Sequence, residues 1–341
     1  MKRVLMAAGI VLLLVLPATA EPEAVGAQQE LVIRVATMAP RNSAWMRGFR
    51  QWDRSMRERS NGAVRLQIYA GGSAGDERSV VQKLQSRQLD AASMSITGLG
   101  MIDRSVYVLN APGIIENYDE LRAVRRAMDR ELKAPFEDAG FKIIGWGDVG
   151  AMRLFSAQRI ERPSDLRRAR PWVWNDNPVF VEWLRTAEVR GVPLDLTEVL
   201  PGLQTRRIDT VPVSALGAVA LQWFSHFRYV SEQANGVVIG GLVMRKDTFD
   251  NLPQDIREEF DAQAARASRQ MARMVMRADD RAYQAVLDRG LTAVDVSDHE
   301  AEWRDVANRT RTRLTGRLYD ADALQRVERI VSQHRARNPA P

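Results

Sequence analysis

The chain has 341 residues, 45% of them hydrophobic and 27% charged, which suits two domains or one large domain with an ample core. It contains no cysteine, so disulfides, thiolate nucleophiles and cysteine metal sites are excluded. The net charge of +6 comes mainly from arginine, and in an exported protein it argues against a nucleic-acid partner, whose cationic residues normally share one face.

Residues 1–20 have the pattern of a secretory signal peptide. A charged start is followed by an apolar run at 4–16 and by the small residues ATA at 18–20. The run is too short to span a bilayer, although an uncleaved membrane anchor is the alternative, and no later segment approaches that length. We expect a mature chain that is soluble in the periplasm, with a disordered leader at 21–29.

The first part of the mature chain alternates between strand and helix patterns. Apolar residues recur every two positions in the predicted strands and every 3.6 positions in the predicted helices. This β-α-β-α-β order predicts a mostly parallel sheet with helices on its faces. The strands are predicted at 31–38, 63–70 and 89–95, and the helices at 44–60 and 76–88.

The second part repeats the alternation and then becomes helical. A helix of about 36 residues is predicted from Pro253 onwards, some 50 Å if straight, which is long enough to lie across more than one domain. Helical patterns also occupy 118–139, 178–187 and 196–207, the last ending before IDTVPVS, and strand patterns occupy 141–150, 152–157, 191–196 and 234–249.

The sequence GGSAG at 71–75 matches the G-x-S-x-G nucleophile elbow and lies between a predicted strand and a predicted helix. A serine hydrolase would use Ser73 with a histidine and a carboxylate from later in the chain. The alternative is a glycine-rich turn without catalytic chemistry, which we favour because no HGG-type oxyanion loop precedes the motif.

Other catalytic and cofactor signals are lacking. The three histidines, His226, His299 and His334, are too scattered to form a metal site, and no pair has the i, i+4 spacing. The chain has neither a G-x-G-x-x-G nor a Walker sequence. We therefore predict a protein without metal or cofactor that is not an enzyme.

Two features indicate a ligand site. Trp172 and Trp174 lie one residue apart in RPWVW, so a strand would place both indoles on one face, as core, as stacking platforms for nucleic acid, or as the floor of a ligand site. Arg153 stands in apolar company directly after a glycine. A lone guanidinium in such surroundings makes a bidentate anchor for an anion, and an ordinary surface arginine is the alternative.

Three stretches resemble the DctP-type periplasmic solute-binding proteins of tripartite ATP-independent periplasmic (TRAP) transporters. They are YAGGSAGDERSVVQKLQSRQLDAASMS with its G-D-E-R turn, MRLFSAQRIERPSDLRRARPWVW with its P-x-D-L turn, and VPLDLTEVLPGLQTRRIDTV with its L-Q-T-x-x-x-D ending. They occur in the family's order and cover most of the mature chain.

This resemblance implies a two-lobed α/β periplasmic-binding-protein fold with a long C-terminal helix spanning both lobes. We predict one lobe at 30–150 plus 235–252, the other at 151–234, and a helical region at 253–337 that braces both. Closure of the lobes on a small-molecule ligand would present a surface to the small and large TRAP membrane subunits. Transport energy would come from an ion gradient, so no ATP site is needed.

The chain departs from the family pattern where the ligand is expected. Trp172 stands where the family usually has an arginine that grips the ligand carboxylate, Val213 where it often has an asparagine, and Leu196 where it often has an aromatic residue. Arg153 corresponds to another family arginine near the ligand. Asn175 matches a polar pocket position.

These departures predict a more hydrophobic ligand than a C4-dicarboxylate. We expect a small organic acid, such as a monocarboxylate with an aromatic or aliphatic body, held at one end by Arg153; a fully apolar, lipid-like ligand and a purely structural role for the indoles are the alternatives. Trp174 and Pro212 would add apolar walls. Thr37 and Thr97 would supply hydroxyl contacts, because ligands in open α/β sheets bind at the carboxyl ends of strands.

Overall fold

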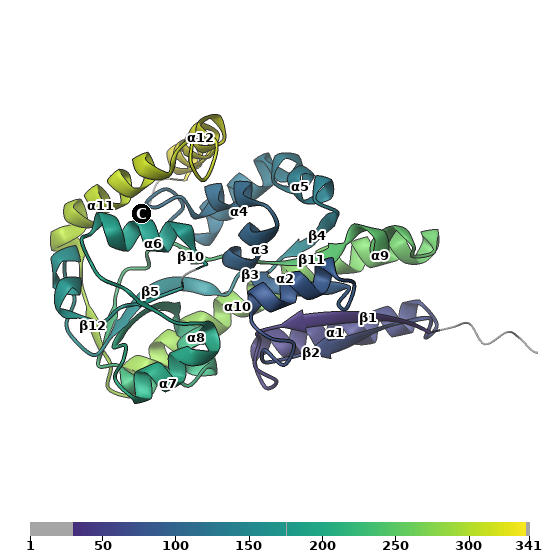
Figure 1. Ribbon diagram of the computed structural model, residues 1–341, viewed down its shortest axis with the longest axis horizontal. Helices are drawn as coiled ribbons and strands as arrows, with labels where there is room; N and C mark the ends of the chain where they lie inside the picture. The colour runs from purple at the N-terminus through teal and green to yellow at the C-terminus, as the bar shows by residue number, and fades with distance from the viewer. Residues whose placement is uncertain (1–29, 175, 339–341) are drawn as a thin grey trace, which may run out of the picture.

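The computed structural model describes residues 30–174 and 176–338; the predicted signal peptide, the leader at 21–29 and Asn175 lie outside the described residues. The chain forms an α/β fold of two lobes, each built on its own sheet (Figure 1). Within the described ranges, no helix has the length and apolar character needed to span a membrane. The predicted fold class is confirmed.

The first lobe is built on a sheet in the order β2-β1-β3-β11-β4. β1 pairs in parallel with β2 and β3, whereas β11 is antiparallel to both β3 and β4. The prediction of a mostly parallel sheet therefore holds only for the first three strands, because the chain returns from the second lobe to supply β11. The strands are β1 (Leu31–Thr37), β2 (Val64–Tyr69), β3 (Ala91–Ser95), β4 (Phe141–Trp146) and β11 (Gly240–Arg245).

Helices cover this sheet, and several begin at side-chain caps. Ser43 caps the first of them, whose Met46, Phe49, Trp52 and Met56 are buried at helical spacing as predicted. The elements are α1 (Ala44–Arg59), α2 (Glu77–Gln85), α3 (Ile96–Ile102), α4 (Tyr118–Ala127), α5 (Asp129–Asp138), α9 (Lys246–Asp250) and the 3-10 helix η1 (Arg104–Asn110).

The second lobe is built on a sheet in the order β10-β5-β9-β12, in which β8 also pairs with β5. Its strands are β5 (Gly150–Ser156), β8 (Thr210–Ser214), β9 (Tyr229–Ser231), β10 (Val237–Val238) and β12 (Thr292–Val294), and a separate pair is formed by β6 (Trp172–Val173) and β7 (Val192–Pro193). Its helical elements are α6 (Pro178–Thr186), α7 (Val199–Gln204), α8 (Ala215–Ala220), η2 (Pro163–Arg168), η3 (Leu196–Glu198) and η4 (Phe224–His226).

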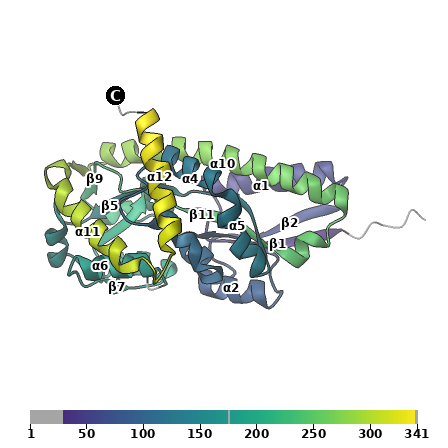
Figure 2. The ribbon, with the colours of Figure 1, turned by 90° about the horizontal axis from the view of Figure 1, so that it is seen from above.

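A 35-residue helix, α10 (Gln254–Asp288), runs along one long edge of the molecule, as Figure 2 shows. It packs against α1 and β4 of the first lobe and against α8 and β5 of the second. After η5 (Ser297–His299), α11 (Glu300–Leu314) packs on α6, and α12 (Ala321–Arg337) packs on α4. The two lobes are thus joined by α10 and again by the α11–α12 pair.

The chain passes between the lobes at two glycine-bearing segments. The predicted single strand at 234–249 is wrong: β10 belongs to the second sheet, β11 to the first, and α9 follows, because the chain changes lobes at Ile239. The earlier passage ends at Gly150, whose φ is +141°. A Cβ there would lie 2.3 Å from the Cβ of Ser214, so this position requires glycine.

Candidate ligand-binding cavity

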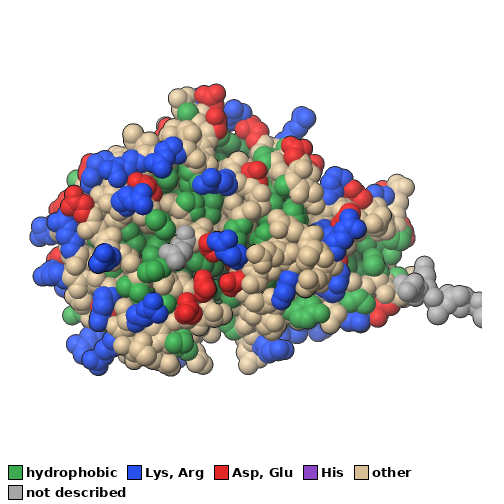
Figure 3. Space-filling view, in the orientation of Figure 1, with side chains coloured by type: hydrophobic (Ala, Val, Ile, Leu, Met, Phe, Trp, Pro, Cys, Tyr) green, Lys and Arg blue, Asp and Glu red, His purple; other side chains and the backbone are tan. Residues whose placement is uncertain are grey.

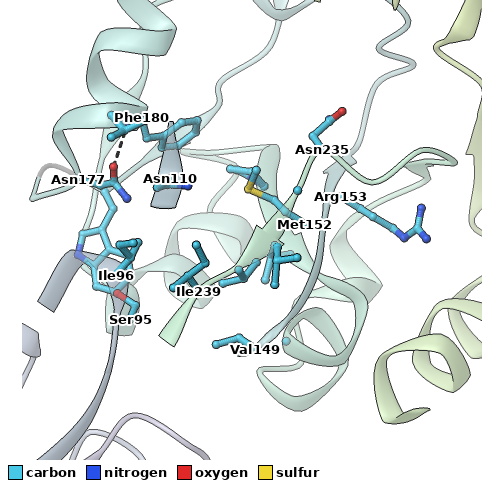
Figure 4. A pocket seen from close by; sticks show the side chains of 18 of the residues that line it. Ser95, Ile96, Asn110, Val149, Met152, Arg153, Asn177, Phe180, Asn235 and Ile239 are labelled. Carbon is cyan, nitrogen blue, oxygen red and sulfur yellow. Dashed lines mark hydrogen bonds between the residues drawn. The ribbon is translucent and has the colours of Figure 1, made fainter. Parts of the chain in front are cut away.

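A cavity of about 710 Å³ lies between the lobes and is lined by residues from both. Its walls are mostly apolar. In Figure 4, Ile96 and Ile239 of the first lobe and Met152 and Phe180 of the second surround the open space. A volume in this range is typical of small-molecule sites, which are concave and largely hydrophobic.

The two indoles of the RPWVW segment lie side by side in this cavity wall. The ring centroids of Trp172 and Trp174 are 5.8 Å apart, and the intervening Val173 packs in a different hydrophobic cluster. Trp172 is 6% exposed, packs edge-on against Trp223, and donates its indole N–H to the Leu194 carbonyl at 2.8 Å. The predicted common face is therefore confirmed.

The first lobe contributes the predicted threonines. Thr37 ends β1 and Thr97 lies in the first turn of α3, and both line the cavity. Beside them, the Glu77 carboxyl accepts hydrogen bonds from the Ser95 and Gly98 N–H groups at 2.6 and 2.8 Å. Burial raises the pKa of Glu77, although these bonds oppose the shift. Glu77, from the G-D-E-R turn, thus fixes the turn between β3 and α3 under the cavity.

Contacts between the lobes lie at the start of α6. Asn177 caps this helix by accepting a hydrogen bond from the Phe180 N–H (Figure 4). Its amide nitrogen donates to the Thr97 hydroxyl at 3.2 Å. The Tyr107 hydroxyl donates to the Asp176 carbonyl at 3.3 Å, and Arg78 forms an ion pair with the Asp176 side chain. These bonds hold the second lobe against α2, α3 and η1 of the first.

Arg153 is the predicted site residue whose position differs most from expectation. Although it lines the cavity, its guanidinium points away from the open space (Figure 4). The group donates to the Ser231 and Glu232 carbonyls, and its central carbon lies 3.9 Å from the centroid of the Tyr283 ring on α10. Successive side chains of a strand face opposite sides, so Met152 takes the cavity side and Arg153 the other. The structure does not place this guanidinium as a ligand anchor.

The remaining predicted residues also lie at the cavity. Leu196, Pro212 and Val213 all line it. Val213 is directly opposite Arg153 in the β5–β8 pair, and Pro212 is opposite Leu154. Directly opposite residues share a face of a sheet, so Pro212 is on the side that Met152 and Leu154 present to the cavity. Asn175 lies outside the described residues.

Several lining residues were not predicted from the sequence. Phe180 and Trp183 reach the cavity from α6, Trp303 comes from α11 and stacks on Trp183, and the amides Asn110 and Asn235 also line the wall. The three-residue spacing of Phe180 and Trp183 on an N-capped helix could have indicated a shared inner face. Nothing local marks the two amides.

The electrostatic character of the wall is unusual for an anion site. Among the described lining residues, the basic ones are Arg153 and Arg304. Arg304 forms an ion pair with Glu300, four residues earlier on α11, and Arg153 is directed away from the cavity. The side chains of Asn110 and Asn235 make no hydrogen bond to other described residues and can therefore donate to a ligand.

Among the described residues, no hydrogen bond or ion pair joins the elbow-like turn to a histidine. Ser73 is exposed in the turn before α2. Of the three histidines, His299 pairs with Glu302, His334 lies beside Asn338 on the last helix, and His226 lies in η4. In the described ranges, no group of His, Cys, Asp or Glu could hold a metal ion.

Comparison with known proteins identifies the family. The model for "bacterial extracellular solute-binding protein, family 7" (DctP) matches residues 35–314. The C4-dicarboxylate-binding periplasmic protein DctP of Rhodobacter capsulatus is 21% identical over 333 residues, covering 96% of both chains. The 2,3-diketo-L-gulonate-binding periplasmic protein YiaO of Escherichia coli is 19% identical, covering 81% of this chain and 84% of its own.

Solved structures show the same fold. A TRAP periplasmic solute-binding protein from Shewanella oneidensis with bound succinate has a TM-score of 0.83 at 15% identity, covering 89% of this chain and 99% of its own. One from Ralstonia eutropha with bound (S)-2-acetolactate has a TM-score of 0.82 at 16% identity, with the same coverage.

Proposed function

The chain belongs to the DctP family of bacterial extracellular solute-binding proteins, and from that premise we propose that it captures a small, largely apolar organic acid in the cavity between its lobes. The family comprises periplasmic binding proteins of TRAP transporters without catalytic activity. The bound ligand would be delivered to the small and large TRAP membrane subunits. No observation favours the hydrolase alternative.

The observation that carries this proposal is the character of the cavity wall. Trp172 and Trp174 lie side by side there, and Phe180 of α6 also lines the space. Burying one large apolar group of a ligand against such walls is worth roughly 1.5–3 kcal/mol from apolar area. A short dicarboxylate has no group of that kind, so its second charge would lose hydration without gaining a cationic partner.

We propose that neutral hydrogen-bond donors bind the polar end of the ligand. Asn110 and Asn235 have free amides in the cavity wall, and the hydroxyl of Thr97 lies near Asn177. Hydrogen bonds from neutral groups to a charged group contribute about 1.5–3 kcal/mol each. Two or three such bonds can hold one carboxylate, and the rest of the ligand would then be apolar. This replaces Arg153 as the proposed anchor.

The proposed units of motion follow those expected from the sequence, 30–150 with 235–252 and 151–234, braced by 253–337, except that 235–238 is assigned to the second lobe because β10 pairs with β5. Their support is that two separate sheets are joined at Gly150 and Ile239, and that α10 packs on both. Rotation about the two passages would open the cavity to ligand, and closure would restore the contacts at Asn177.

The proposal is tested by the ligand preference of the purified protein. Small molecules released from native protein are identified by mass spectrometry, and affinities for hexanoate, phenylacetate, succinate and hexanol are compared by calorimetry. We expect the two monocarboxylates to bind at least tenfold more tightly than succinate. Tighter binding of succinate would contradict an apolar site, and equal binding of hexanol would indicate a lipid-like ligand without an acid group.

Matched variants test the anchor. Asn110→Leu and Asn235→Leu should each weaken binding of the preferred monocarboxylate about tenfold, because a leucine of similar size donates no hydrogen bond. Arg153→Gln is the control and should change affinity by less than threefold. If the Arg153 variant alone loses binding, the guanidinium turns inward in the complex and the assignment to the amides is wrong.

A further inference from the structure

The outward face of α10 carries a basic stripe, which we define as Arg266, Arg269, Arg273, Arg277 and Arg281. Their spacing of three, four, four and four residues puts all five on one side of the helix, over roughly 22 Å. All five are exposed. No acidic residue occurs on α10 between Asp261 and Asp279, and the described ion pairs include none of the five.

This arrangement differs from the rest of the surface. Elsewhere many arginines are paired, such as Arg34 with Asp90 and Arg170 with Asp209. On the face in Figure 3, basic side chains are interspersed with acidic ones over both lobes. In the stripe, the one exposed carboxylate is Asp280, so a net excess of positive charge lies along one straight element.

α1 extends this basic face. Gln51 of α1 accepts a hydrogen bond from Gln270 of α10, and a Cβ at Gly48 would touch Met271, which places the outer edge of α1 beside the stripe. Arg47 and Arg54, three or four residues from Gln51, are exposed, and the described ion pairs do not include them. Figure 2 shows the two helices side by side along the long edge of the molecule.

We propose that the basic stripe docks the protein electrostatically on an anionic phospholipid surface. A row of guanidinium groups attracts the diffuse negative charge of lipid headgroups without needing shape complementarity. A specific protein partner would need an aromatic or aliphatic anchor at the centre of the contact. Between Arg266 and Arg281 the exposed side chains other than the arginines are those of Gln270 and Asp280, and the exposed Ala262 and Gln284 flank the stripe, so none of them is a large apolar anchor.

Docking at the stripe leaves the ligand cavity free. No described residue of α10 lines the cavity, whose walls include residues of β3, β5, α3 and α6. A solute-binding protein held loosely at the membrane in this way would search for its membrane subunits in two dimensions. The attraction acts over about one Debye length, 8–10 Å at physiological ionic strength, so it is reversible and salt-sensitive.

The test is co-sedimentation with lipid vesicles, using protein purified from the periplasm so that a leader peptide does not contribute. One set of vesicles contains phosphatidylcholine alone, and the other contains phosphatidylcholine with about 30% phosphatidylglycerol, an anionic lipid. We expect binding to the anionic vesicles only, lost in high salt. Absence of binding to the anionic vesicles at low salt would overturn the proposal.

Two matched variants locate the surface. R266Q/R269Q/R273Q/R277Q/R281Q removes the stripe, and R130Q/R190Q/R206Q/R207Q/R329Q removes the same charge from exposed arginines on other elements. The stripe variant should bind anionic vesicles at least 30-fold more weakly and the control within threefold of the wild type. Equal losses would show an effect of net charge alone and overturn the proposal.

Further measurements separate this surface from ligand binding and from a protein partner. Thermal unfolding checks that the variant folds, with R269Q/R273Q/R277Q as the milder form, and ligand affinity should be unchanged in both. The arginine-to-lysine form of the stripe should keep vesicle binding, because the charge matters rather than the fork geometry. Stripe-dependent binding to the isolated membrane subunits in detergent, without binding to vesicles, would overturn the lipid assignment.

Discussion

At the scale of the residue, the two sides of β5 decide what the cavity can bind. Met152 faces the ligand space and Arg153 stacks on Tyr283 of α10. The strand therefore places an apolar side chain at the cavity and its charged side chain against the long helix. Trp172 fills the position where the sequence resemblance places an arginine. The site therefore lacks an inward guanidinium among its described residues.

Trp172→Arg should restore a cationic site. Without ligand, we expect the melting temperature of this variant to fall by several degrees, because an unpaired guanidinium would replace an indole that is 6% exposed. Succinate should then stabilise the variant but not the wild type, as measured by thermal shift. Trp172→Phe, which keeps an apolar wall, is the control. An unchanged ligand profile in the arginine variant would mean that this position does not contact the ligand.

At the scale of the element, α10 holds the second lobe through one buried carboxylate. Asp279 is 3% exposed and accepts hydrogen bonds from the Leu216 N–H at 2.8 Å and the Ala151 N–H at 2.9 Å. Leu216 and Ala151 are the second residues of α8 and β5, next to the chain passage at Gly150. A Cβ on Gly150 would also lie 2.7 Å from this carboxylate, so the glycine leaves the space in which Asp279 of α10 reaches the second lobe.

Burial raises the pKa of Asp279, against the opposing effects of its two backbone hydrogen bonds and of Arg153. The nearby Asp280 raises it further. In the unfolded chain an aspartate titrates near pH 3.9. Between that pH and the raised folded pKa, the unfolded state loses its proton more readily than the folded state. The contribution of Asp279 to the free energy of unfolding is therefore largest at low pH and decreases as the pH rises.

Comparison with Asp279→Asn tests this sign. The variant should be less stable at every pH by about 1–3 kcal/mol, because an amide cannot accept from both N–H groups. The stability difference between wild type and variant should be greater at pH 4 than at pH 7, as measured by urea unfolding. A difference that grows with pH would show that the pKa is lowered instead. Asp288→Asn, at the exposed last residue of α10, is the control.

At the scale of the whole molecule, closure depends on few direct contacts between the lobes beside the cavity. Tyr107 and Arg78 of the first lobe both hold Asp176, and neither lines the cavity. Burial raises the pKa of Tyr107 above its usual range, so its hydroxyl stays protonated and donates at any physiological pH.

Removing these two contacts should favour the open form. In Tyr107→Phe/Arg78→Ala we expect ligand affinity to fall about 5- to 30-fold, since a neutral hydrogen bond contributes about 0.5–1.5 kcal/mol and an exposed ion pair up to about 1 kcal/mol. Small-angle scattering should show a larger radius of gyration with and without ligand. Arg104→Ala, which removes another side chain of η1, is the control. Weaker binding with unchanged dimensions would argue against an effect on closure.

The sequence by itself determined the features that depend on local patterns. Alternation and helical periodicity predicted β1, α1 and the long helix to within a few residues, and the spacing of Trp172 and Trp174 predicted their common face. These follow from the geometry of one strand or one helix. The apolar pattern of 234–249 predicts a single strand, because the pattern does not record the change of lobe at Ile239.

Only the tertiary structure decided what faces the cavity. The strand pattern around Arg153 is the same whichever face of the sheet meets the cavity. In the structure the Arg153 side chain packs on Tyr283, more than a hundred residues later in the chain. Asn110 and Asn235 line one cavity although Asn110 ends η1 and Asn235 lies in the loop before β10. Local periodicity fixes which residues share a face, whereas the packing of distant elements fixes which of the two faces the ligand meets.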